Sequence, residues 1–176
     1  MRLGLSKDEV KLNNYTSEWN IEFNRVKEEI MLVTKLETKR IEHIGSTAIK
    51  DMVAKPIIDI LIGIEDTKHI DNNMMKALQS IGFLPLRVER PGEIVLAKFL
   101  DDTYKVKTHY IHLVDYDKEL WKNLIFFRDY LNTIDEARDE YKKLKVALAE
   151  RKSINITTYT NLKEPFVKGI FSLRTN

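Results

Sequence analysis

The sequence predicts an α+β fold, in which a small β-sheet is flanked by helices and the final third of the chain is helical. Three patterns favour it: apolar residues recur at helical spacing near the start, short segments rich in β-branched residues fill the middle, and two amphipathic stretches begin at Leu120. Runs of helix, then strands, then helices are typical of α+β proteins. Because 176 residues with 43% hydrophobic side chains suffice for one ordinary core, we expect a single domain over residues 1–176.

The first predicted element is a helix after Ser17, a residue type that often caps a helix N-terminus. The apolar residues that follow are spaced by three and four positions, so one face of the helix is expected to be buried. They are Trp19, Phe23, Val26, Ile30 and Val33.

A strand, a Gly-Ser turn and a short helix come next. Residues 41–44 form a short alternating segment, as in a strand, and Gly45 with Ser46 ends it. Residues 47–52 then suit one or two helical turns.

The segment after Pro56 predicts a central strand. Proline disfavours the helical conformation of the residue before it, so Lys55 is expected to be extended. Residues 57–62 are rich in β-branched side chains, as in a buried strand. Asp59 is the only charged residue among them.

A helix and a hairpin follow. The apolar residues of this helix are Ile70, Met74, Leu78 and Ile81. Gly82 can end it, because glycine tolerates the left-handed conformation common at helix ends. Residues 94–100 and 105–114 flank a polar segment at 101–103, and this pattern predicts an antiparallel hairpin.

The last third is predicted to be helical. One apolar face is formed by Leu120, Leu124, Phe127 and Leu131, and a second, after Asp135, by Ala137, Tyr141, Leu144 and Leu148. Pro165 either opens or kinks a final helix. The alternation of acidic and basic residues from 135 to 152 indicates a solvated helix face.

Charge and composition argue against several classes of protein. The 29 basic and 27 acidic residues leave a net charge of +2, too small for a general nucleic-acid or membrane binder. The absence of cysteine excludes disulfide frameworks and thiolate metal sites. The first residues lack an apolar signal segment, and the longest apolar run, 57–64, is far shorter than the ~20 residues of a membrane helix. We therefore expect a cytoplasmic protein without a nucleic-acid or membrane partner.

The Gly45-Ser46 turn is the first candidate binding feature. Between a strand and a short helix, backbone N–H groups and a hydroxyl can approach a phosphate at the helix N-terminus. The alternative is an ordinary turn with an N-terminal cap.

Asp59 is the second candidate, because a carboxylate in an apolar strand costs several kcal/mol unless it is paired or bound to a cation. It either accepts backbone N–H bonds or pairs with Lys55 or His43, or it is a Mg²⁺ ligand opposite a bound phosphate. The two-carboxylate Asp-x-Asp pattern is absent, since Leu61 stands two residues later.

His112 is the third candidate, as a metal ligand, a proton carrier or a core side chain. His109 should point to the opposite face of the strand, because strand residues alternate, so the two histidines are not expected to share a site. The basic residues that could meet phosphates, or lie on the surface, are Lys55, Lys98, Lys107 and Arg128.

Several segments together resemble the signature of the GrpB-like protein family. They are residues 42–48, 54–60, 108–114 and 127–131, followed by Tyr141, Leu144, Lys145, Tyr159, Lys163 and Phe166. The resemblance runs from about Val10 to the C-terminus. It implies membership of the nucleotidyltransferase superfamily, with a mixed sheet, a Gly-Ser turn that grips a nucleoside triphosphate, and acidic strand residues that bind a divalent metal.

The leading hypothesis is accordingly a nucleotidyltransferase-like enzyme with an unknown acceptor. Its assigned residues are Gly45, Ser46 and Lys55 for the nucleotide, Asp59 and His112 for catalysis, and Asp59, Glu42 and His112 for Mg²⁺ or Mn²⁺. The alternative is a noncatalytic nucleotide-binding or folding-accessory domain, because related domains fused to dephospho-coenzyme A kinase are described as helping that enzyme fold.

Overall fold

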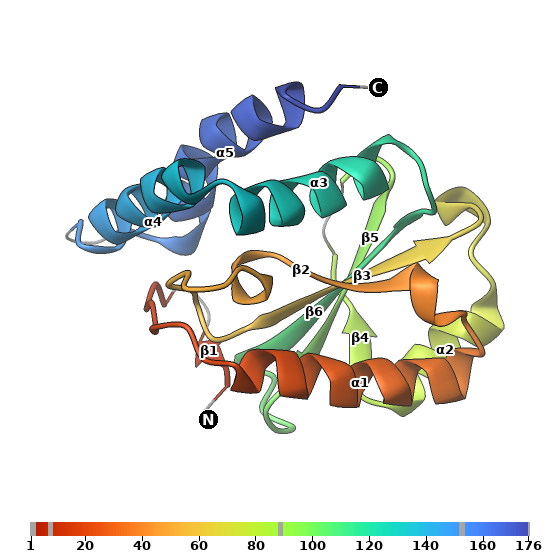
Figure 1. The fold of residues 1–176 in the computed structure, drawn as a ribbon. Helices are drawn as coiled ribbons and strands as arrows, with labels where there is room; N and C mark the ends of the chain where they lie inside the picture. Colours follow the sequence, from red (N-terminus) through yellow and green to blue (C-terminus); the bar gives the residue numbers. More distant parts are fainter. Residues whose placement is uncertain (1–2, 7–8, 88–89, 152–153, 176) are drawn as a thin grey trace.

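The structure is a computed structural model that describes residues 3–6, 9–87, 90–151 and 154–175 (Figure 1). It is a mixed α+β fold, as the sequence predicts. Its elements in chain order are β1 (Leu5–Ser6), α1 (Glu18–Thr34), β2 (Ile41–Ile44), β3 (Ile58–Ile64), α2 (Asn72–Ser80), β4 (Phe83–Pro85), β5 (Glu93–Phe99), β6 (Val106–Asp115), α3 (Glu119–Thr133), α4 (Asp135–Ala149) and α5 (Ile156–Ser172).

The sheet is mixed, in the order β2-β3-β6-β5-β4, with β1 paired to β6. The predicted hairpin is confirmed, because β5 and β6 pair antiparallel. β3 and β6 pair in parallel, with Asp59 opposite Tyr110 and Leu61 opposite His112. This pairing places side chains from two distant segments on one face of the sheet.

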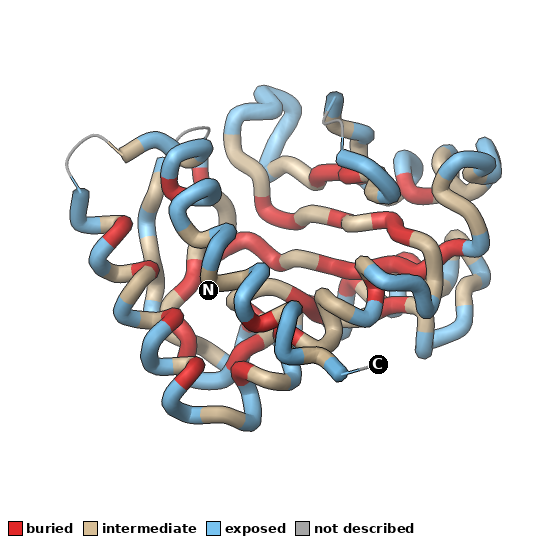
Figure 2. The backbone as a smooth tube through the Cα atoms, turned by 90° about the horizontal axis from the view of Figure 1, so that it is seen from above, coloured by how far each residue is buried: buried red, intermediate tan, exposed pale blue. Residues whose placement is uncertain are grey.

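Helices cover both faces of the sheet (Figure 1). α1 and α2 pack on one face through a core that contains Trp19, Ile60 and Ile111. Part of the other face lies under α3, where Leu61 and Trp121 meet in a second core cluster. In Figure 2 the buried residues follow the strands across the middle of the molecule, while exposed segments surround them.

A third apolar cluster joins α3, α4 and α5 to the segment that follows the Gly-Ser turn. Its buried residues are Ile49, Met52, Phe127, Leu131, Ala137, Tyr141 and Ile170. The three C-terminal helices therefore form a layer that is packed beside the turn rather than over the whole sheet.

Several local predictions need correction. Ser17 does not cap α1 with its side chain; the Thr16 hydroxyl accepts from the Glu18 N–H instead, at 3.3 Å. Only Ser46–Ala48 adopt a short 3₁₀ turn where one or two helical turns were predicted for 47–52. Of the two alternatives for Pro165, opening of the last helix is wrong, since the residue lies inside α5. None of the helices in the described ranges has the length and apolar character of a membrane span.

Candidate functional site

The candidate site lies where β2 ends beside β3. Gly45 follows β2 with a φ of +69°, a conformation that favours glycine. A Cβ at this position would clash with the carboxylate of Asp59. Ile44 pairs with Asp59 across the sheet, so the strand register brings the turn and the acidic residue together.

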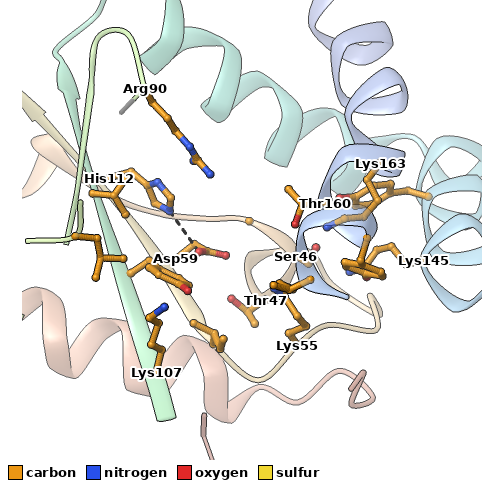
Figure 3. Close-up of a pocket in the computed structure, with 18 residues that line it drawn as sticks. Ser46, Thr47, Lys55, Asp59, Arg90, Lys107, His112, Lys145, Thr160 and Lys163 are labelled. Atoms are coloured by element: carbon orange, nitrogen blue, oxygen red, sulfur yellow. Dashed lines mark hydrogen bonds and ion pairs between the residues drawn. The ribbon is translucent and has the colours of Figure 1, made fainter. Parts of the chain in front are cut away.

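A cavity of about 380 Å³ lies beside this turn (Figure 3). Its walls come from the turn, from β3, β5 and β6, and from α4 and α5. Its polar and charged lining comprises Gly45, Ser46, Thr47, Asp59, Tyr110, His112, Tyr141, Tyr159 and Thr160, with the cations Lys55, Arg90, Lys107, Lys145 and Lys163. Asp59 is the only carboxylate among the described residues that line it. This excess of positive charge favours an anionic ligand.

His112 is held between two carboxylates. Its Nε2 lies 3.3 Å from Asp59 Oδ1, and its Nδ1 lies 2.5 Å from Glu93 Oε1. Burial lowers the pKa of His112, but the hydrogen bonds and charges of Asp59 and Glu93 outweigh burial and raise it to about 9. At neutral pH the ring is therefore protonated, and both nitrogens donate.

The same contact settles the pairing of Asp59. Burial raises the pKa of Asp59, but the hydrogen bond and the charge of His112 lower it by more. The pKa of the carboxyl group therefore lies below its usual value. The partner is thus His112, and not Lys55 or His43, the two partners that the sequence suggested.

Glu42 lies apart from this pair. Arg128 of α3 donates from Nη1 to Glu42 Oε2 at 2.6 Å and to the carbonyl oxygen of His43 at 3.0 Å. Among the described residues, no group of three His, Cys, Asp or Glu side chains is arranged to hold a metal ion. The structure therefore brings Asp59 and His112 together without Glu42.

The turn is also fixed from the α1 side of the sheet. His43 Nδ1 lies 3.0 Å from Asn20 Oδ1, and its Nε2 lies 2.9 Å from Thr47 Oγ1. The ring stacks on Phe23 with centroids 4.7 Å apart. Burial lowers the pKa of His43 to about 4, so the ring is neutral at physiological pH and holds Thr47 through hydrogen bonding.

Three lysines form one wall of the cavity, which we call the lysine wall: Lys55, Lys145 and Lys163. Lys145 is only 1% exposed and donates to the carbonyl oxygen of Val53. Burial, with the charges of Lys163 and Lys55, lowers the pKa of Lys145 well below its ordinary value. Burial and the charge of Lys55 lower the pKa of Lys163 to about 8. The solvated helix face predicted for 135–152 is therefore wrong at Lys145.

Tyr159 adds an unpaired donor to the lysine wall. The residue is fully buried, and its hydroxyl has no hydrogen-bond partner among the described residues. The Lys163 ammonium lies 4.3 Å from the centroid of its ring. A buried hydroxyl without a partner costs roughly 1–3 kcal/mol, and the residue that carries it lines the cavity.

Two residues, His109 and Lys98, lie on the face of the sheet away from the site. His109 Nε2 lies 3.1 Å from Glu22 Oε1 of α1, which confirms that His109 and His112 point to opposite faces. Lys98 lies 3.6 Å from Glu29 of α1, so it does not meet the cavity.

Sequence reasoning did not assign Arg90, Lys145, Tyr159 or Lys163 to the site, although three of them belong to the quoted family signature. A spacing signal was present in the helices. Lys145 follows the cavity residue Tyr141 by four positions, and Lys163 follows Tyr159 by four, so each pair shares a helix face. Arg90 lies in a loop and left no comparable signal.

Sequence comparisons find relatives that match nearly the whole chain. The family model described as GrpB protein matches residues 9–172. The "Glutamate-rich protein GrpB" of Alkalihalophilus pseudofirmus is 39% identical over 171 residues, which cover 97% of this chain and 98% of that protein. The UPF0157 protein YqkA of Bacillus subtilis is 30% identical over 164 residues, which cover 92% of this chain and 46% of YqkA.

Structural comparisons agree with the fold. The crystal structure of the conserved protein GrpB from Enterococcus faecalis matches with a TM-score of 0.77 and 26% identity, covering 92% of this chain and 95% of that one. The Cid1 poly(U) polymerase bound to MgATP matches with a TM-score of 0.55 and 13% identity, covering 85% of this chain and 50% of the polymerase. At that identity the likeness shows a nucleotidyltransferase-like fold and no more.

Proposed function

This chain belongs to the GrpB family, and from that premise we propose that its cavity binds a nucleoside triphosphate for transfer of the nucleotidyl group to a second molecule. The observation that carries the proposal is the lysine wall with the unpaired Tyr159 hydroxyl, next to the Gly45-Ser46 turn. The nucleotidyltransferase-like fold supports the same choice of ligand.

The phosphates would lie between the turn and the lysine wall. Backbone N–H groups of a glycine turn and lysine ammonium groups are the usual donors to phosphate oxygens. Lys55, Lys145 and Lys163 would stabilise the charge that develops on pyrophosphate as the acceptor bonds to the α-phosphorus. This chemistry needs the acceptor positioned against the α-phosphorus and the charge on the leaving pyrophosphate stabilised. It does not need a covalent nucleophile from the protein.

The donor set restricts how Mg²⁺ or Mn²⁺ would bind. Asp59 is the single carboxylate lining the described part of the cavity, so the ion would be held by Asp59 together with phosphate oxygens and water. When bound, it would neutralise charge on the reacting phosphates. His112, being protonated, is assigned the role of holding the Asp59 carboxylate in place.

A second candidate function is a noncatalytic nucleotide-binding or folding-accessory domain. One observation favours it: neither Glu42 nor His112 joins Asp59 in a metal-binding group. The two candidates share nucleotide binding and differ in turnover.

Thermal unfolding tests the shared claim. A ligand that binds only the native state raises its stability, so a nucleoside triphosphate at about 100 times its dissociation constant should stabilise the protein by about 2.7 kcal/mol. Nucleotides are screened with and without Mg²⁺ or Mn²⁺ on wild type, Asp59→Asn and Lys163→Met, with Lys98→Met as a matched control on the other face of the sheet. Lys163→Met should lose the shift, and Lys98→Met should keep it.

If no nucleotide raises the melting temperature of the wild type, the proposal fails. Pyrophosphate release in the presence of candidate acceptors then separates the two functions. Nucleotide binding without release, across phosphorylated and hydroxylated acceptors, would favour the noncatalytic role.

A further inference from the structure

Lys163 lies where two cavities meet. It lines the cavity of the candidate site and also a neighbouring cavity, again of about 380 Å³, whose lining comes mostly from α5. The residues that line both cavities are Arg90, Tyr141, Thr160 and Lys163. The Lys163 side chain is half-buried. Its amine is therefore within reach of a small molecule from either cavity.

No carboxylate among the described residues forms an ion pair with Lys163. Glu164, the next residue in α5, pairs with Lys168 instead, at 2.7 Å. The Lys163 amine lies against the ring of Tyr159, 4.3 Å from the ring centroid. This lysine is thus in contact with an aromatic face and is not held by an acidic side chain.

The surroundings of Lys163 also favour its uncharged form. Burial, with the charge of Lys55, lowers the pKa of Lys163 to about 8, and Asp59 acts in the opposite direction with less effect. Lys145 is close enough for the charge of Lys163 to lower its pKa in turn. At pH 7.4 a lysine of pKa 8 is about one-fifth uncharged, whereas an ordinary lysine of pKa 10.4 is about one-thousandth uncharged. Because only the uncharged amine is a nucleophile, Lys163 combines reactivity with access.

The same surroundings decide which reagent fits. The positive charge of Lys55 acts at Lys163, so an anion is attracted to this part of the cavity. Phosphate is an anion that lysine ammonium groups bind well. An acyl phosphate carries such a group directly beside an electrophilic carbon. The second cavity leaves room for its acyl chain while the phosphate lies beside the lysine wall.

We propose that Lys163 is an acylation site that reacts with acyl phosphates. The uncharged amine bonds to the acyl carbon, the bond between that carbon and the phosphate oxygen breaks, and phosphate leaves with the electron pair. The nitrogen loses one proton to the solvent, which gives a neutral amide. Acylation removes one cation from the lysine wall and should weaken nucleotide binding. That consequence rests on the proposed function, whereas the acylation itself does not.

Acetyl phosphate is the probe, and quantitative peptide mass spectrometry measures the acetylation rate at each lysine of the full chain at pH 7.4. Lys168 is the internal control, because it belongs to the same helix and 71% of its side chain is exposed. The roughly 200-fold difference in uncharged fraction between Lys163 and an ordinary lysine is partly offset, because a weaker base is a weaker nucleophile. Lys163 should therefore acetylate about tenfold faster than Lys168. Exposure alone predicts the opposite order, and acetylation of Lys163 at the rate of Lys168 or below overturns the proposal.

A second reagent separates attraction of the phosphate from reactivity of the amine. Phenyl acetate is an uncharged acetyl donor, so the preference for Lys163 over Lys168 should be several-fold smaller with it. Inorganic phosphate at constant ionic strength should slow acetylation of Lys163 by acetyl phosphate and leave the rate at Lys168 unchanged. If the preference is the same with both donors and phosphate does not protect Lys163, recognition of acyl phosphates is refuted.

Two variants test the source of the preference. Lys55→Met should slow acetylation of Lys163 by acetyl phosphate at least threefold, because it removes a charge that attracts the anion and lowers the pKa of Lys163. Lys98→Met, on the other face of the sheet, should leave the rate unchanged. Amide spectra of both variants show whether the fold is retained, and an unchanged rate in folded Lys55→Met would contradict the proposal. These outcomes do not depend on nucleotide binding, which the thermal-shift experiment decides separately.

Discussion

Binding of a phosphate-bearing ligand should make the protein take up a proton at mildly alkaline pH. Without a ligand, burial and the charge of Lys55 lower the pKa of Lys163 to about 8. A phosphate against the ammonium favours its charged form and raises that pKa toward or above the ordinary lysine value of about 10.4. Lys163 should therefore gain a proton when the ligand binds.

The expected uptake follows from the two pKa values. At pH 8.5 a lysine of pKa 8 is about one-quarter protonated, and a lysine of pKa above 10 is almost fully protonated, so binding takes up about 0.7 proton at this residue. Near pH 6.5 Lys163 is charged in both states and its contribution vanishes. Uptake at this residue should therefore grow as the pH rises from 6.5 to 8.5.

Isothermal titration calorimetry measures the uptake directly. The observed binding enthalpy is compared among buffers of different ionisation enthalpy, and the slope gives the number of protons exchanged. Lys163→Arg is the matched control, because its guanidinium stays charged at this pH and cannot take up a proton. Wild type should exceed this variant by about 0.7 proton at pH 8.5. Equal slopes with intact binding in both proteins would refute the placement of phosphate against Lys163.

Three further predictions concern single substitutions. Tyr159→Phe removes a buried hydroxyl without a partner, so it should stabilise the unliganded protein by about 1 kcal/mol in urea unfolding. It should also weaken nucleotide binding, whereas removal of a hydroxyl that does not contact the ligand would leave binding unchanged. Gly45→Ala forces a side chain at φ +69° against Asp59, so chemical denaturation should show a loss of roughly 1–3 kcal/mol, whereas an unchanged midpoint would mean that the turn can move. Arg128→Met leaves Glu42 without its partner and should cost about 1–3 kcal/mol; the companion change Glu42→Gln should recover part of that loss if the ion pair causes it.

The sequence predicts those parts of the fold that depend on local pattern. The face of α1 that carries Trp19 and Ile30, and the hairpin of β5 and β6, follow from apolar spacing and from one polar turn. The parallel pairing of β3 with β6 joins residues about fifty positions apart, and no short-range pattern encodes it. β4 is three residues long, too short for its alternation to stand out.

In the candidate site, too, some features follow from local pattern and others depend on tertiary packing. The Gly45 turn and Asp59 were identifiable because each breaks a local rule: a glycine at a strand end and a carboxylate in an apolar strand. The partner of Asp59 depends on the β3–β6 register, which places His112 beside it. Arg128 of α3 forms an ion pair with Glu42, which lies 86 positions earlier in the chain. This contact could not be predicted without the packing of α3 on β2.

The lysine wall joins three separate parts of the chain: Lys55 precedes β3, Lys145 belongs to α4 and Lys163 belongs to α5. Their mutual repulsion works against close docking of these parts, and it contributes with burial to the lowered pKa values of Lys145 and Lys163. A polyanion between them would reverse the sign of that interaction. The ligand would then stabilise the packing of the helical layer against the sheet, so occupancy of the cavity would determine how stable the packing of α5 is.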